Sequence, residues 1–222
     1  MVIHGAIFDQ DGTMYDTERL YFQCWVQTVR EFGLEPPFSL ESHIHVAGSA
    51  GERMLSVLHD LYPAADPAAL RDRAFELGME AQRNGPPEKP GLHEAVDFLK
   101  GKGLRLAIGS SCARAQIERN LRFTGLTAAF DTIVGSDDIR MSKPDPEVFQ
   151  IAARRIGCDP SECLVFEDSV NGIRAAHAAG CVPVLIPDCL PIPPDVRALA
   201  AVEVPDFFAA IEWLQKDPIL GA

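Results

Sequence analysis

The stretch Phe8-Asp9-Gln10-Asp11-Gly12-Thr13 directly follows a mostly apolar run at residues 2–7. Such a run predicts a buried strand, so the carboxylates of Asp9 and Asp11 stand where that strand ends. Gly12 allows the chain to turn sharply at this point. Because buried negative charge is costly, the arrangement indicates a bound cation or a reaction that uses the carboxylates.

Four further short apolar runs occur at residues 105–109, 132–135, 163–166 and 182–186. Helical patterns lie between these four runs. Apolar strands that alternate with helices are typical of a parallel sheet buried on both faces, with right-handed crossovers. We therefore predict an α/β fold with a Rossmann-like parallel sheet.

About a hundred residues separate the first two predicted strands, and most of them have helical patterns. The helical period fits a set of apolar residues, Phe22, Trp25, Val26, Val29 and Phe32. More helices are predicted at residues 40–46, 50–61 and 68–84. A stretch rich in Pro and Gly then leads to the second strand. We predict a core domain of residues 1–15 and 87–222, and an inserted all-helical cap domain of residues 16–86 that serves as a lid.

The formal net charge of -12 over 222 residues argues against a nucleic-acid partner, which would need clustered Lys and Arg. The N-terminus lacks the pattern of a secretory signal, and no apolar run approaches the ~20 residues that span a bilayer. The six cysteines are scattered without a C-x-x-C pair, which favours a reduced compartment and disfavours zinc. We expect a soluble cytoplasmic protein that binds no membrane.

Polar side chains stand at or just beyond the ends of the predicted strands, where an open parallel sheet binds its ligands. Magnesium prefers oxygen ligands, a phosphate dianion suits a helix N-terminus and a lysine, and a carboxylate can attack phosphorus. A second carboxylate could protonate the leaving group and later deprotonate water. The set therefore points to Mg²⁺-dependent phosphoryl transfer. Its members are Asp9, Asp11, Ser110, Ser111, Lys143, Glu167 and Asp168.

Each of these residues also has a simpler interpretation. The first two carboxylates could form a solvated turn, and the Glu167-Asp168 pair could cap the following helix. Serine is a common helix N-cap, which would explain Ser110, and Lys143 could be a surface lysine. Their joint position at the strand ends favours the catalytic interpretation.

Three other residues, one cysteine and two histidines, have reactive or titratable side chains that the predicted phosphoryl-transfer site does not use. Cys112 lies near the predicted phosphate loop, where a helix N-terminus could lower its pKa, but a small spacer residue is favoured. His43 and His45 lie in the predicted cap, and a surface position is favoured over a contact with substrate.

Four motifs in order resemble those of the haloacid-dehalogenase-like phosphatases. They are Asp9-x-Asp11-Gly12-Thr13, the strand-end Ser110, Lys143-Pro144, and Glu167-Asp168-Ser169 followed by Gly172. The helical insert after the first motif resembles the C1-type cap of that family. The resemblance spans nearly the whole chain and implies a phosphoric monoester hydrolase that acts on a small phosphate ester.

The resemblance also implies a role for each motif residue. Asp9 would be the nucleophile and a Mg²⁺ ligand, and Asp11 the general acid and base with its backbone carbonyl on the metal. Lys143 and Ser110 would hold the transferring phosphoryl group, with Ser111 contributing its backbone N–H. Asp168 would complete the metal site, and Glu167 would be a further ligand or support one.

Within the family the chain looks most similar to the β-phosphoglucomutase-like group, on the Asp16-Thr17 pair and the run at residues 171–176. Mutases of that group share a cap histidine where this chain has Tyr21. A mutase must shield its aspartyl-phosphate from water, so the departure favours hydrolysis of sugar phosphates and similar metabolites over a sugar-phosphate mutase. Thr17, Tyr21 and Arg53 are the cap candidates for substrate contact, and a monomer is expected.

A receiver-like phospho-acceptor module for signalling is the alternative from another functional class. Such a module also gathers carboxylates, a hydroxyl and a lysine around Mg²⁺. It is close to the minimal size of a domain and has no helical insert after its first strand. The insert in this chain therefore favours the enzyme.

Overall fold

The computed structural model describes residues 2–47, 49, 51–216 and 219. The chain folds into two compact units. One unit is formed by Met1–Asp16 and Gly85–Ala222, and the other by Thr17–Asn84. The divisions predicted from the sequence fall after residues 15 and 86.

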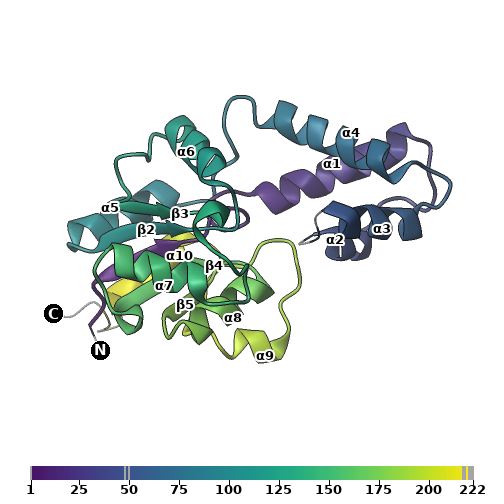
Figure 1. The fold of residues 1–222 in the computed structure, drawn as a ribbon. Helices are drawn as coiled ribbons and strands as arrows, with labels where there is room; N and C mark the ends of the chain where they lie inside the picture. The colour runs from purple at the N-terminus through teal and green to yellow at the C-terminus, as the bar shows by residue number, and fades with distance from the viewer. Residues whose placement is uncertain (1, 48, 50, 217–218, 220–222) are drawn as a thin grey trace. The chain divides into compact units, whose positions relative to one another are not determined.

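The first unit is built on a six-stranded parallel sheet with the strand order β3-β2-β1-β4-β5-β6 (Figure 1). The predicted α/β fold with a parallel sheet is therefore confirmed. The sequence does not predict β6, because a two-residue edge strand is too short to show a pattern. The strands are β1 Gly5–Phe8, β2 Arg105–Gly109, β3 Thr132–Val134, β4 Cys163–Glu167, β5 Val182–Leu185 and β6 Val202–Glu203.

Helices cover both faces of this sheet. The helices α5 Leu92–Gly101, α6 Arg114–Phe123 and α10 Phe207–Lys216 pack on one face, and α7 Glu147–Arg155 and α8 Val170–Ala178 pack on the other. Shorter elements complete the unit. They are η1 Ser136–Asp138, η2 Pro160–Glu162 and α9 Pro194–Arg197.

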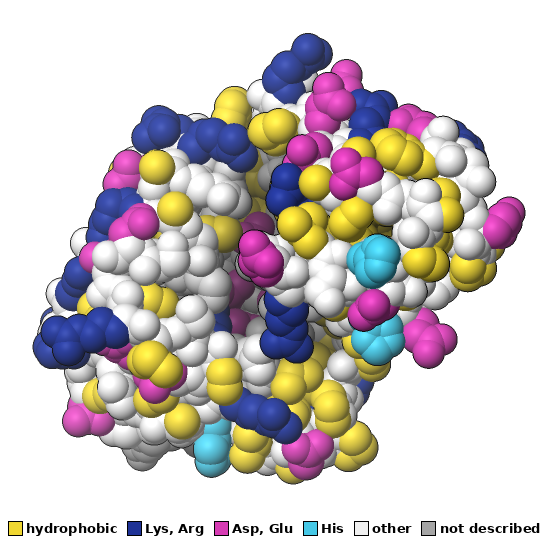
Figure 2. Space-filling view, turned by 45° about the vertical axis from the view of Figure 1, so that its right-hand side comes forward, with side chains coloured by type: hydrophobic (Ala, Val, Ile, Leu, Met, Phe, Trp, Pro, Cys, Tyr) yellow, Lys and Arg dark blue, Asp and Glu magenta, His cyan; other side chains and the backbone are white. Residues whose placement is uncertain are grey.

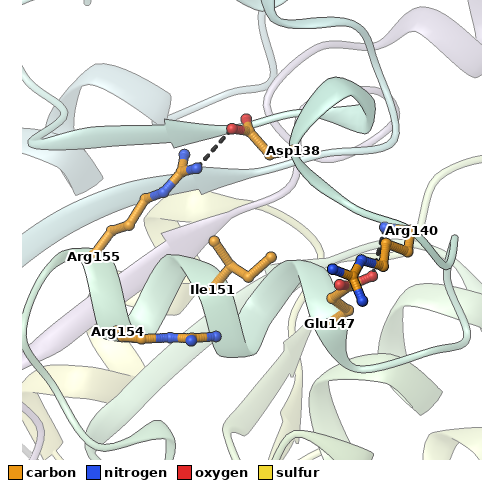
Figure 3. A pocket seen from close by; sticks show the side chains of 6 residues that line it. All are labelled: Asp138, Arg140, Glu147, Ile151, Arg154 and Arg155. Carbon is orange, nitrogen blue, oxygen red and sulfur yellow. Dashed lines mark hydrogen bonds and ion pairs between the residues drawn. The ribbon is translucent and has the colours of Figure 1, made fainter.

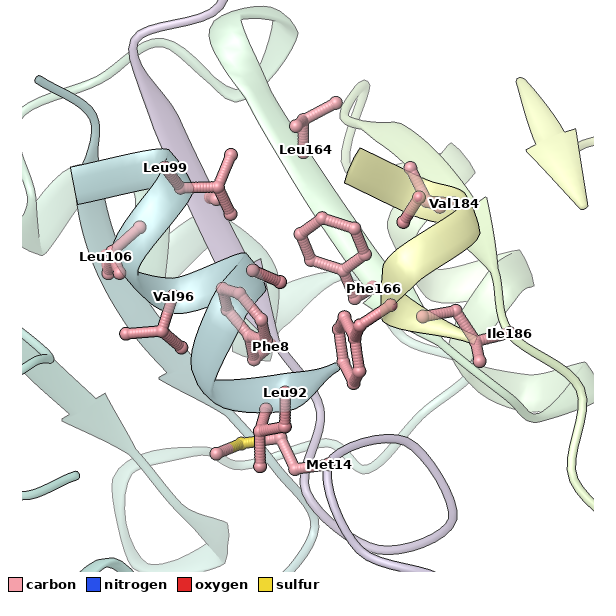
Figure 4. Close-up of a cluster of buried hydrophobic side chains, with 14 of the residues drawn as sticks. Phe8, Met14, Leu92, Val96, Leu99, Leu106, Leu164, Phe166, Val184 and Ile186 are labelled. Atoms are coloured by element: carbon pink, nitrogen blue, oxygen red, sulfur yellow. The ribbon is translucent and has the colours of Figure 1, made fainter. Parts of the chain in front are cut away.

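The central strand β1 is apolar on both sides, because its alternate residues enter different cores. Phe8 joins the core beneath α5 and α10, and Ile7 joins the core beneath α7 and α8. The rings of Phe8 and Phe166 lie 4.7 Å apart, with Leu92 and Val96 of α5 nearby (Figure 4). Burial of this kind stabilises the fold by about 25 cal/mol per Å² of apolar surface. The last residue of β1, Phe8, is fully buried, and the carboxylate of Asp9 follows it directly.

The register of the sheet brings three strand ends together. Phe8 pairs with Ile108 of β2 and with Phe166 of β4. The residues that follow these positions therefore lie side by side at the carboxyl edge of the sheet.

The second unit consists of four helices, α1 Thr17–Glu31, α2 Leu40–Val46, α3 Gly51–Leu61 and α4 Pro67–Ala81. Its core includes Trp25, Leu58 and Leu70, which are buried. Ser39 and Asp66 cap α2 and α4, because their side chains accept N–H bonds from the first helical turn. Trp25 and Val29 of the predicted stripe thus pack inside this unit, whereas Val26 and Phe32 are 38% and 41% exposed.

Acidic and basic side chains both occur across the face seen in Figure 2, so the net charge of -12 is not gathered in a single patch on that face. In the described part of the chain, no helix combines the length and the apolar character that a membrane span requires.

Candidate active site

The carboxylates of β1 and β4 lie at the shared edge that their register creates. The N–H of Asp9 donates to the carbonyl of Phe166 at 3.0 Å, which continues the strand pairing by one residue. Asp9 is 6% exposed, Glu167 1% and Asp168 6%. Three nearly buried acidic residues therefore occupy the end of the central strand pair, where they need compensating positive charge.

Lys143 supplies part of that charge. Its Nζ contacts Asp9 Oδ1 directly and lies 2.8 Å from Glu167 Oε1. It also lies 4.7 Å from the centre of the Phe149 ring, a favourable cation–π position. Burial would by itself lower the pKa of Lys143, but the carboxylates of Asp9 and Glu167 outweigh it and raise the pKa. The amine therefore stays protonated, and the surface interpretation of Lys143 is wrong.

Burial raises the pKa of Asp9 above its ordinary value, and the ammonium of Lys143 opposes this shift. The carboxylates of Glu167 and Asp11 add to the repulsion. One lysine thus balances only part of the negative charge at this edge. A divalent cation is the chemistry that would balance the rest.

Asp168 is held against the turn that follows Asp9. Thr13 Oγ1 donates to Asp168 Oδ1 at 2.8 Å. A Cβ on Gly12 would clash with Asp168 Oδ2, and Gly12 has a φ of 80°. Only glycine permits both this conformation and this approach, so the Gly-Thr pair of the first motif fixes the place of Asp168.

Asp11 contacts the loop that follows β2. The Sγ of Cys112 lies 2.6 Å from Asp11 Oδ2, although 101 positions separate the two residues in the chain. Burial, and then the carboxylate of Asp11, raise the pKa of Cys112. The alternative of a lowered pKa for Cys112 is excluded, because α6 begins two residues later and the nearest charge is the negative one of Asp11. Cys112 is a neutral thiol in contact with Asp11 rather than a spacer.

Ser110 follows β2 as predicted, but it does not open a helix. α6 begins at Arg114, whose N–H donates to Asp137 Oδ2 at 2.8 Å. The carbonyl of Cys112 accepts from the N–H of Ser136 at 2.8 Å, which ties this loop to the segment that follows β3. Ser110 is 1% exposed, and its Oγ accepts from the N–H of Cys112 at 3.2 Å. The side chain of Ser111 is exposed.

The residues at this edge fit a magnesium ion by the chemistry of their donors. Mg²⁺ usually takes one or two carboxylates and completes its shell with waters and phosphate oxygens. Asp9 and Asp168 supply two carboxylates, and the backbone of Asp11 supplies a carbonyl between them in the chain. Among the described residues, no group of three or more His, Cys, Asp or Glu side chains is arranged to hold a metal ion by itself.

The cap candidates are placed by contacts inside the second unit. Tyr21 packs on α4, where a Cβ on Gly78 would lie 2.5 Å from its ring, and its ring centre is 6.0 Å from that of Phe75. Thr17 is buried at the start of α1, and Arg53 is exposed on α3. Packing within the unit explains the position of Tyr21. A role of these three residues in substrate contact stays a prediction from the sequence.

The two cap histidines differ in environment. His43 is buried, with its Nε2 3.2 Å from Glu18 Oε2 and its ring centre 5.4 Å from that of Phe22. A surface position is therefore wrong for His43, which turns toward the core of its unit. His45, on the same short helix, is exposed.

A separate groove of about 420 Å³ lies along α7 (Figure 3). Its acidic side chains are already engaged. Asp138 Oδ1 lies 2.6 Å from Arg155 Nη2. Glu147 Oε2 accepts hydrogen bonds from the backbone N–H groups of Arg140 and Met141 at 2.7 and 2.9 Å. Glu147 thereby holds the turn just before Lys143. The residues that line the groove are Asp138, Arg140, Glu147, Ile151, Arg154 and Arg155.

Glu167 is also held by the start of α8, which leads to a first prediction. Ser169 N–H donates to Glu167 Oε2 at 2.7 Å, and a Cβ on Gly172 would clash with Glu167 Oε1. We expect Gly172→Ala to displace Glu167 from Lys143 and to cost about 1–3 kcal/mol. Thermal unfolding should show a Tm lower by roughly 5 °C.

Gly101→Ala is the matched control for this change, because a Cβ there meets no atom within 4 Å. Its Tm should stay unchanged or rise slightly, since alanine favours the helix. A Gly172→Ala protein as stable as the control would show that Glu167 can move at no cost.

Sequence reasoning gives Thr13 no partner, treats Cys112 as a spacer, and does not single out Asp188. The first two are missed because their partners are distant in the chain. Asp188 follows β5 much as other carboxylates follow β1 and β4, so the strand-end pattern could have indicated it.

Comparison with known proteins points to one family. A sequence profile described as "Haloacid dehalogenase-like hydrolase" matches residues 6–186. The phosphorylated carbohydrates phosphatase of Thermotoga maritima is 31% identical over 179 residues, which cover 80% of this chain and 82% of that protein. The fructose-1-phosphate phosphatase YqaB of Escherichia coli (strain K12) is 34% identical over 179 residues, which cover 79% of this chain and 92% of that protein.

A solved structure supports the same relationship. The HAD family hydrolase from Deinococcus radiodurans R1, crystallised with bound phosphate and sodium, superposes with a TM-score of 0.81 at 27% identity. The match covers 99% of this chain and 98% of that one. With a matching profile over most of its length and relatives above 30% identity, the chain belongs to the haloacid dehalogenase-like hydrolase family.

Proposed function

We propose that the protein is a Mg²⁺-dependent phosphatase that hydrolyses small phosphorylated metabolites, with sugar phosphates as the first substrate class. The observation that carries the proposal is the contact of Lys143 with both Asp9 and Glu167 at the end of the central strands. A protonated amine beside a nearly buried carboxylate would offset the repulsion between that carboxylate and a phosphate dianion. Monomeric state and cytoplasmic location stay predictions from the sequence.

The first step is attack by a carboxylate oxygen of Asp9 on the phosphorus of the ester. The new bond joins this oxygen to phosphorus, and the bond from phosphorus to the alcohol oxygen breaks. Asp11 in its protonated form gives its proton to that oxygen, so the alcohol leaves neutral. Lys143 offsets the repulsion between the carboxylate and the phosphate dianion.

The second step returns the enzyme to its starting state. A water molecule attacks the phosphorus of the aspartyl-phosphate, and Asp11, now ionised, takes a proton from that water. The bond from phosphorus to Asp9 breaks, which releases inorganic phosphate and the Asp9 carboxylate. One ester and one water thus become one alcohol and one phosphate.

Asp9, Asp168 and the backbone carbonyl of Asp11 would hold the magnesium ion. When bound, the ion stabilises negative charge on the phosphoryl oxygens. The chain's own groups do the remaining work. Thr13 orients Asp168 by its hydrogen bond, and Lys143 stays protonated beside Asp9.

Sugar phosphates come first among candidate substrates because of the relatives. Two of them are named for phosphorylated carbohydrates and for fructose 1-phosphate. They align with about four fifths of this chain, at 31% and 34% identity.

A phosphate-release screen tests the proposal. Wild-type protein with Mg²⁺ is incubated with hexose phosphates, pentose phosphates, nucleotides and phosphoglycolate, and free phosphate is measured. We expect release from at least one sugar phosphate. An isomerised sugar phosphate without free phosphate would instead identify a mutase, and a stable phosphoprotein without turnover would identify a phospho-acceptor.

A further inference from the structure

Lys89 lies in the segment that leads from the second unit back to the sheet, and it is only 9% exposed. Its Nζ lies 3.2 Å from Asp16 Oδ1 and 3.0 Å from Asp188 Oδ1. The side chain of Asp188 is 1% exposed. We call Asp16, Lys89 and Asp188 the linker triad. Burying such a group of charges is costly, so its position needs an explanation.

Backbone hydrogen bonds join the linker triad to the turn that follows Asp11. The N–H of Lys89 donates to the carbonyl of Met14 at 2.9 Å, and the N–H of Asp16 donates to the carbonyl of Pro87 at 2.8 Å. Segments 14–16 and 87–89 therefore run as a short paired ribbon. A displacement of Lys89 would be passed directly to the turn.

Tyr15 links this ribbon to Asp11 itself. It forms a parallel bridge with Asp11 and an antiparallel bridge with Glu88. Its carbonyl accepts from the N–H of Gly12 at 2.8 Å, and its buried hydroxyl lies 3.2 Å from Thr124 Oγ1. The backbone around Asp11 is thus held on one side by residues 87–89.

The other end of the triad is attached to the sheet. Asp188 comes two residues after Ile186, whose N–H donates to the carbonyl of Glu167 at 2.8 Å. The ion pair between Lys89 and Asp188 therefore connects the ribbon to the ends of β4 and β5. Without it, the ribbon would lose this attachment to the sheet edge.

We propose that Lys89 and Asp188 are positioning residues for Asp11. Their ion pair holds the ribbon against the sheet edge, which keeps the carboxyl of Asp11 where it protonates the leaving alcohol. The inference rests on the proposed phosphatase function and deepens it, since the triad would act through the backbone around Asp11. Of the two steps that use Asp11, the departure of the alcohol is the one that a change of leaving group reports.

The choice of leaving group separates this role from a purely structural one. A sugar alkoxide is a poor leaving group and needs the proton of Asp11, whereas the acidic p-nitrophenol leaves without one. A triad that only stabilised the fold would affect both kinds of ester equally. The ratio kcat/KM reports the first phosphoryl transfer in both cases.

The test compares Lys89→Met and Asp188→Asn with the wild type on two esters. One is the best sugar phosphate of the phosphate-release screen, and the other is p-nitrophenyl phosphate. Because general acids contribute about 10²–10⁴ to such steps, we expect kcat/KM for the sugar phosphate to fall by about tenfold or more. For p-nitrophenyl phosphate we expect a fall of less than about threefold.

Three measurements guard the interpretation. Lys89→Arg, which keeps the charge, should restore much of the lost selectivity between the esters, and Lys102→Met removes an exposed lysine as the matched control. Thermal unfolding shows which variants are folded. If Lys89→Met does not fold, the comparison of the two esters rests on Asp188→Asn. Equal losses on both esters in a folded variant, or no loss on either, overturn the proposal. A wild type inactive on both esters overturns the proposed function itself.

Discussion

Asp9→Asn should abolish turnover, with kcat for the best sugar phosphate falling by at least about 10³-fold. The amide of asparagine has no nucleophilic carboxylate oxygen, so the phosphoryl group cannot be transferred to the enzyme. The change also removes the charged partner of Lys143. Steady-state phosphate release is the measurement, with the Tm recorded to show that the variant is folded.

Asp97→Asn is the matched control, because Asp97 is an exposed acidic residue on α5. It should keep wild-type kcat. Trapping with radiolabelled substrate adds a direct readout, since wild type should carry a phosphate label on Asp9 and the Asp9→Asn protein should not. Hydrolysis at the wild-type rate by the Asp9→Asn protein would remove Asp9 from the role of nucleophile.

Removal of divalent cations should have the second-largest effect. With excess chelator we expect kcat/KM to fall by at least about 100-fold, because several kcal/mol of charge stabilisation is lost at the transition state. Added Mg²⁺ should restore activity. The carboxylates left at the edge would then depend on Lys143 for their counter-charge.

Stability gives a readout of the metal that does not depend on turnover. An ion bound only by the folded state stabilises it by about 2.7 kcal/mol at 100 times its Kd, so Mg²⁺ should raise the Tm by several degrees. Asp168→Asn should lose much of that rise, whereas Asp97→Asn should keep it. Full activity in excess chelator, together with no Tm shift on adding Mg²⁺, would exclude magnesium from the mechanism.

Local sequence patterns were enough to predict the α/β architecture and the acidic residues at the strand ends. Apolar runs of strand length predict the sheet because both of its faces are buried, as Phe8 and Ile7 show in opposite cores. Parallel strands end at one edge, so the residues after β1 and β4 had to meet. Asp9 and Glu167 follow from these two rules without knowledge of any contact.

The contacts that complete the site join residues that are far apart in the chain, so local sequence patterns do not predict them. Cys112 meets Asp11 across 101 positions, and Lys89 meets Asp188 across almost as many. No period or spacing in a single chain encodes which of several loops will place two side chains within hydrogen-bond distance. His43 shows the same difficulty, since its burial depends on how α2 packs in its unit.

The amino-acid order alone accounts for strand positions, the strand-end carboxylates and the family, because periodicity and motif spacing are local properties. Only the tertiary structure shows the partners of Lys143, the start of α6 at Arg114, the contact of the Cys112 thiol with Asp11, and the linker triad. These depend on packing between distant segments, where burial and charge act through space and not along the chain.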